Sequence, residues 1–146
     1  MNDNETASWD AAAPTPLSLS AQLGLLQEWV DGFALSFVFS DSASAVRLDA
    51  DVLYCARHSD ANDLVTEALT AAQVAARPVV MMFLGCDVRV MLDALARLNE
   101  RRSLLEKCGQ VVLLVCPVAA KTNVRNSCPD LWHIRTSILS PELPSA

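Results

Sequence analysis

The spacing of hydrophobic residues near the amino terminus predicts a helix followed by a strand. Leucines recur at helical intervals over 17–31, and Ser18 or Ser20 supplies a polar cap at the start of this segment. The aromatic and β-branched composition of 33–39 is typical of a strand. The apolar side chains expected on one face of this strand are Phe33, Leu35, Phe37 and Phe39.

The middle of the chain alternates between helical and extended patterns. Residues 60–76 and 88–107 carry apolar side chains at helical spacing. Residues 79–84 and 111–116 are continuous apolar runs, which are typical of strands that are buried on both faces. This alternation of apolar strands with amphipathic helices predicts parallel βαβ units with right-handed crossovers.

Two further extended segments complete the predicted fold. Residues 52–57 follow 33–39 too closely for a crossover helix to fit, so we expect these two strands to form an antiparallel hairpin. Residues 131–138 alternate between apolar and polar positions and predict a half-exposed edge strand. The fold class is therefore α/β: a three-layer, mixed but largely parallel sheet of about five strands, with helices on its faces and an N-terminal helix and hairpin.

The two ends of the chain fall outside this pattern. Residues 1–16 and 139–146 are expected to be a disordered leader and a disordered tail around a single domain over 17–138. The uncharged runs 68–76 and 78–86 are far shorter than the roughly 20 apolar residues of a membrane span. The start of the chain carries acids and no basic region ahead of an apolar one. We therefore expect a cytoplasmic protein that makes no membrane contact, with the nucleus as the open alternative.

Charge and motif content narrow the possible functions. The formal net charge is −6, and because several of the acids lie in the two ends, the body of the chain is nearly neutral. A body without a basic stripe argues against binding to nucleic acid, because such binding requires several side chains that neutralise phosphates. The sequence contains no phosphate-loop or dinucleotide-binding glycine motif, and its five cysteines and two histidines show no zinc-binding spacing. We therefore expect no cofactor and no metal.

One pair of residues is a candidate for catalysis. If 52–57 and 79–84 are neighbouring parallel strands, the loops after them leave the sheet at the same carboxyl edge, where open α/β sheets place their sites. The first loop carries His58, and the second carries Cys86 at the start of a helix. The helix dipole there favours a thiolate, and a nearby imidazole could act as a base.

This arrangement resembles that of caspase-like cysteine peptidases, which place a His and a Cys after neighbouring strands. The resemblance covers these two loops alone, and Ser59 and Gly85 stand where that family has a Gly after its His and usually an Ala before its Cys. A small thiol-dependent enzyme, of cysteine hydrolase or redox type, is the hypothesis that the pair supports, with Asp60 or Asp87 orienting the imidazole. In the alternative, Cys86 packs as a small hydrophobe and His58 is a solvated loop residue.

A second hypothesis needs no catalysis, and we favour it. The lack of cofactor motifs, metal ligands and a basic surface is typical of a protein-binding or regulatory module that acts through a partner protein, a homo-oligomer or a larger assembly. Such a module requires apolar surface beyond what its own core uses. The interface candidates are Trp29, Phe37, Trp132, His133 and Arg135.

Overall fold

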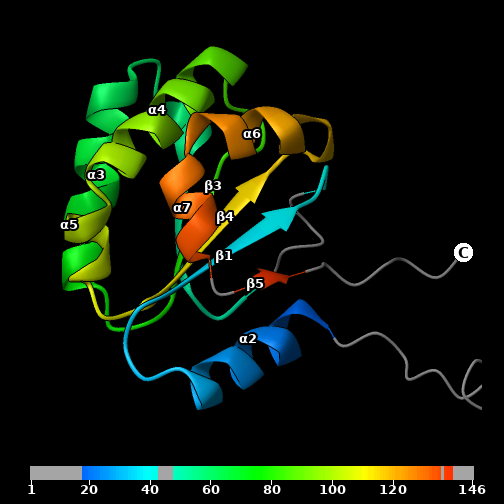
Figure 1. Ribbon diagram of the computed structural model, residues 1–146, viewed down its shortest axis with the longest axis vertical. Helices are drawn as coiled ribbons and strands as arrows, with labels where there is room; N and C mark the ends of the chain where they lie inside the picture. The colour runs from blue at the N-terminus through cyan, green and yellow to red at the C-terminus, as the bar shows by residue number, and fades with distance from the viewer. Residues whose placement is uncertain (1–17, 43–47, 136, 140–146) are drawn as a thin grey trace, which may run out of the picture.

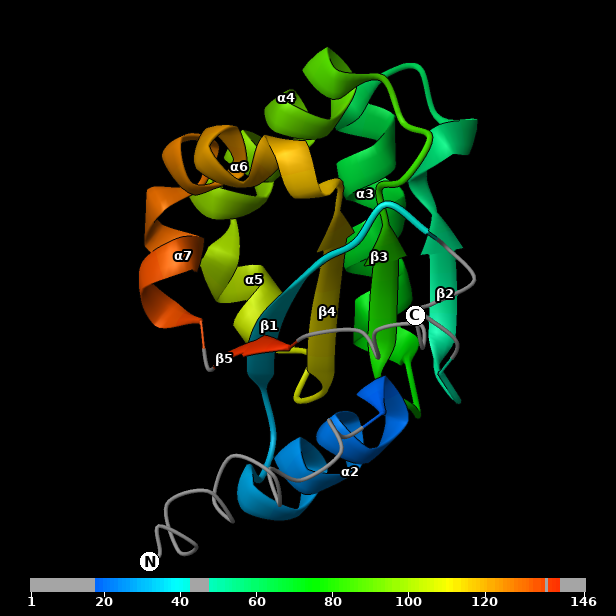
Figure 2. The same cartoon turned by 90° about the vertical axis from the view of Figure 1, so that its right-hand side faces the viewer.

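Five strands form one sheet in the order β2-β3-β4-β1-β5, and every neighbouring pair is parallel (Figures 1 and 2). The computed structural model that shows this arrangement describes residues 18–42, 48–135 and 137–139. The α/β fold that the sequence predicts is therefore confirmed. The strands are β1 (Ala34–Phe39), β2 (Asp51–Tyr54), β3 (Val79–Met82), β4 (Val111–Cys116) and β5 (Ser137–Leu139).

Each of the three long helices begins at a side-chain cap that the sequence supplies. The side chains of Ser18, Asp60 and Asp87 accept hydrogen bonds from backbone N–H groups in the first turns of α2, α3 and α4. Such caps satisfy N–H groups that have no partner within the helix. The helices are α2 (Leu19–Trp29), α3 (Ala61–Val74), α4 (Val88–Glu100), α5 (Arg102–Glu106), α6 (Lys121–Ser127) and α7 (Pro129–Ile134), with single 3₁₀ turns at η2 (Cys55–Arg57) and η3 (Val118–Ala120).

Helices lie against both faces of the sheet, because alternate strand residues point to opposite sides. On one face, Leu35, Val112 and Leu114 pack in a single buried cluster with side chains of α3, α4, α5, α6 and α7. On the other face, Val38 and Leu113 pack in a second cluster with the buried leucines of α2. Figure 1 shows α2 on the side of the sheet opposite α3 and α4. The four continuous apolar residues of β3 and the six of β4 are all buried, as expected for strands covered on both faces.

The antiparallel hairpin expected from the sequence is wrong. Strand β1 lies between β4 and β5, whereas β2 is at the far edge of the sheet, and no pairing is antiparallel among the described strands. The connection between β1 and β2 has eleven residues, and an extended chain of that length reaches about 36 Å. This reach allows a parallel return without a crossover helix. Leu48 and Ala50, at the end of the connection, pack in the α2-side cluster.

The edge strand expected over 131–138 is wrong for its first half. Residues Pro129–Ile134 form helix α7, and the strand at the edge of the sheet is the shorter β5. Proline at the first position of a helix and an acid in its first turn both favour a helix start, and Pro129 and Asp130 supply them. The helix expected over 88–107 is also divided, at Arg101, into α4 and α5.

One residue beyond the predicted domain belongs to the sheet. Leu139, which the sequence places in the tail, is a buried residue of β5. The predicted leader and the rest of the predicted tail lie outside the described residues. In the described ranges, no helix has the length and apolar character that a bilayer crossing requires.

The burial of α4 against the sheet leads to a stability prediction. Leu95 is fully buried in the larger cluster, so Leu95→Ala is expected to lower the free energy of unfolding by about 2–5 kcal/mol through lost transfer energy and a new cavity. Leu104→Ala, at an exposed position of α5, is the control and should stay within about 0.5 kcal/mol of the parent. Urea unfolding followed by far-UV circular dichroism measures both. Equal losses in the two variants would contradict this packing of α4.

Candidate functional site

The carboxyl ends of β2 and β3 bring two loops together, as the sequence led us to expect. The two strands are parallel neighbours, with Tyr54 opposite Met82 at their ends. The turn η2 follows β2, and the loop with Gly85 follows β3. A side chain at Gly85 would place its Cβ 3.6 Å from the Cβ of Ala56, so the loops are in contact. Gly85 also has a φ of +83°, a conformation that favours glycine.

His58 is held by α3 and not by the cysteine loop. Its Nε2 contacts Oε1 of Glu67, and Nη2 of Arg57 lies 3.4 Å from the other oxygen of the same carboxylate. The His58 backbone N–H also donates to the carbonyl of Cys55. Within the described ranges, His58 and Cys86 share no hydrogen bond. The imidazole therefore has a carboxylate partner, but that partner is Glu67, which the sequence analysis did not identify.

The surroundings of Cys86 stabilise the thiol over the thiolate. Burial raises the pKa of the half-buried Cys86, and the nearby charge of Asp87 raises it further. Asp87 also caps α4, accepting hydrogen bonds from the N–H groups of Arg89 and Val90 at 2.9 and 3.2 Å. The N–H groups that would stabilise a thiolate at a helix start are therefore bound to a carboxylate.

Three other cysteines near this edge are buried as small apolar side chains. Burial raises the pKa of Cys55 and that of Cys128 to about 12, and it raises the pKa of Cys116 as well. The Cys128 thiol donates to the carbonyl of Val124 at 3.1 Å, one helical turn earlier. All three belong to the cluster between the sheet and helices α3 to α7. These thiols therefore pack as small hydrophobic side chains.

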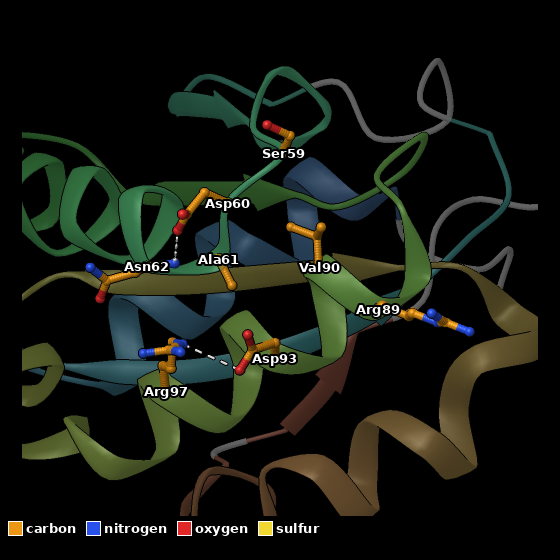
Figure 3. A pocket seen from close by; sticks show the side chains of 8 residues that line it. All are labelled: Ser59, Asp60, Ala61, Asn62, Arg89, Val90, Asp93 and Arg97. Carbon is orange, nitrogen blue, oxygen red and sulfur yellow. Dashed lines mark hydrogen bonds and ion pairs between the residues drawn. The ribbon is translucent and has the colours of Figure 1, made fainter.

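A polar cavity of about 310 Å³ lies between the first turn of α3 and the side chains of α4 from Arg89 to Arg97 (Figure 3). Asp60 caps α3, and its Oδ1 lies 2.7 Å from the N–H nitrogen of Asn62. Asp93 pairs with Arg97 across one turn of α4 at 3.2 Å, while Arg89 points away from that pair in Figure 3. Asp60 and Asp87, the two candidates for orienting the imidazole, are thus both helix caps. The charged groups of the cavity other than Arg89 bind one another or the backbone.

The aromatic interface candidates near α7 form an internal cluster. Phe37 is fully buried, and its ring centroid lies 5.0 Å from that of Trp132. The guanidinium group of Arg135 lies over the ring of Trp132, 4.4 Å from the ring centroid. His133 is exposed on α7 and not on an edge strand. The contact between Phe37 and Trp132 therefore joins α7 to β1, and Arg135 stacks on Trp132.

Trp29 lies elsewhere, at the end of α2, and is 83% exposed. It borders an apolar groove of about 410 Å³, which we call the α2–β5 groove, lined by Gln22, Leu25, Leu26, Trp29 and Leu139. Leu25 is 45% exposed, and Ile138 in β5 is 38% exposed. The sequence identified Trp29 as an interface candidate but not Leu25 or Leu139. The spacing of four between Leu25 and Trp29, off the buried leucine stripe, was the available signal.

No family model, curated protein or solved structure matches this chain in the comparisons made with each. Among the residues that the structure describes, no three His, Cys, Asp or Glu side chains gather closely enough to hold a metal ion.

The cysteine surroundings lead to a reactivity prediction. Because the pKa of Cys86 is raised, its thiolate fraction at neutral pH is below that of an ordinary cysteine, and its alkylation by iodoacetamide should be slow at pH 7 and accelerate as the pH rises. His58→Ala should leave this rate unchanged, since Glu67 is the partner of the imidazole. Mass spectrometry of the folded protein over a pH series measures the rate at each cysteine. Fast reaction of Cys86 near neutrality, slowed by His58→Ala, would support the thiol enzyme instead.

Proposed function

We propose that this chain is a non-catalytic protein-binding module that docks a partner protein in the α2–β5 groove. The observation that carries the proposal is the exposure of Trp29 beside that groove. Tryptophan is enriched among the residues that dominate binding energy, because it buries a large apolar area with few rotatable bonds. Burying a side chain as exposed as Trp29 would stabilise a complex by about 2–4 kcal/mol.

The apolar character of the groove extends over two elements. Leu25 and Trp29 come from α2, whereas Leu139 comes from the last strand. The adjoining side of α2 already packs on the sheet through Leu19, Leu23 and Leu26. Helix α2 is therefore apolar on a second side that the described part of the fold leaves exposed, which is the pattern of a docking surface.

The other candidate sites give less support for a function. The ring of Trp132 in α7 is covered by the guanidinium group of Arg135 and packs against Phe37 of β1. At the carboxyl edge, the raised pKa of Cys86 and the pairing of His58 with Glu67 favour a structural role for both residues. These contacts support the choice of a binding module over a thiol enzyme.

A reducing compartment fits the proposal. All five cysteines are free, and three of them are buried. Reduced, buried thiols are typical of cytoplasmic and nuclear proteins. We therefore propose the cytoplasm as the location in which the partner is met, with the nucleus as the alternative.

The proposed function predicts that contact with the partner is centred on Trp29. A photo-crosslinking amino acid at position 29 of the full chain, in cells that express it, should capture a discrete protein. The same amino acid at position 74 should not, although Val74 on α3 is 79% exposed. With the purified partner, Trp29→Ala should weaken the complex about tenfold or more in titration calorimetry, while Val74→Ala leaves it unchanged. Equal crosslinking at the two positions, or equal affinity of the two variants, would refute the docking site.

A further inference from the structure

We infer that the segment that occupies the α2–β5 groove is an amphipathic helix whose apolar ridge is flanked by lysine or arginine. This inference rests on the proposed function and adds the chemistry of the partner. The shape of the groove, the shortness of β5 and the charge of α2 each contribute to it.

The α2 wall of the groove has the spacing of a helix-packing ridge. Gln22, Leu25, Leu26 and Trp29 stand at positions i, i+3, i+4 and i+7 of one helix. These four residues span about 10 Å, or two turns. A second helix can lay large side chains at matching intervals against such a ridge.

The β5 wall is too short to favour an added strand. Strand β5 has three residues, and in a strand the backbone groups of alternate residues point to the same side. Its outer edge therefore offers one or two residues for pairing. Pro141, two residues after Leu139, has no N–H to donate. Apolar contact with Leu139, and not main-chain pairing, is what β5 provides to the groove.

The charge beside the groove is negative. Glu28 and Asp31 are exposed at the end of α2, and no described residue forms an ion pair with either of them. The sequence from 18 to 42 contains no lysine or arginine. A helix carboxyl terminus already bears a partial negative charge, so these acids oppose the helix dipole and do not stabilise α2. A cationic partner would relieve this unfavourable charge.

The same negative charge argues against occupation of the groove by a second copy of the chain or by the chain's own terminal segments. A second copy of the chain would bring its own Glu28 and Asp31 to the interface. The leader carries Asp3, Glu5 and Asp10 without a base, and the segment 140–146 carries only an acid. Like charges brought together at an interface weaken it, whereas opposite charges speed association and fix orientation.

Three synthetic peptides of about 18 residues test the inference on the full chain. The first has leucines at the intervals of an amphipathic helix and lysines between them. The second replaces every lysine with glutamate, and the third is a scramble of the first without the apolar ridge. Fluorescence anisotropy should show the lysine peptide binding about tenfold or more tighter than either control. Trp29→Ala should abolish this preference, Val74→Ala should retain it, and Glu28→Lys with Asp31→Lys should reverse the choice between lysine and glutamate.

Each other outcome overturns a specific step. Equal binding of the lysine and glutamate peptides would refute the basic partner and leave the proposed docking site standing. Equal binding of the scramble would refute the helical ridge. Binding that Trp29→Ala leaves intact, in a variant whose circular dichroism matches the parent, would refute the groove and the proposed function together. Absence of binding by every peptide, or self-association that Trp29→Ala abolishes, would refute the basic helix as the occupant.

Discussion

The pairing of β1 with β4 at the centre of the sheet is the contact on which the rest of the fold depends. It aligns six residues from each strand and joins Ala34 to Val111, which are far apart in the chain. Strand β1 also pairs with β5 on its other side, so the amino-terminal and carboxyl-terminal parts of the fold meet there. Since α2 precedes β1 by a short link, the position of β1 brings α2 next to β5. The α2–β5 groove exists because of this pairing.

Burial of the sheet on both faces explains why the pKa values of the thiols are raised and why apolar side chains of α2 remain exposed. The thiols at the ends of β2 and β4 lie inside the cluster under α3 to α7, and loss of water around them raises their pKa values. The other face is covered by α2, which buries one leucine stripe and leaves a second apolar side at Leu25 and Trp29. The same requirement to cover apolar strands thus buries thiols on one side and leaves Leu25 and Trp29 exposed on the other.

The regular elements were predictable because their patterns are local. The spacing of apolar residues over 60–76 predicts α3, and the continuous apolar run 111–116 is β4. Helix α7 was missed because the few residues from Trp132 to Ile138 fit strand alternation as well as two short elements. In the candidate site, the juxtaposition of the two loops followed from parallel strands, but the pairing of His58 with Glu67 did not, because Glu67 lies two turns into α3.

The sequence by itself determined the fold class, the long helices with their caps, and the central strands, since each depends on residues within a few positions of one another. It also determined that residues 18–42, which include α2, carry acids and no lysine or arginine. Only the tertiary structure decided the neighbours of β1 and the partner of His58, because strand order and side-chain contacts depend on which distant segments bury each other. It likewise decided that Phe37 is core and Trp29 is surface, although both are aromatic residues beside apolar neighbours. Burial is a property of the assembled sheet and helices, and local spacing does not encode which of two apolar faces the fold will cover.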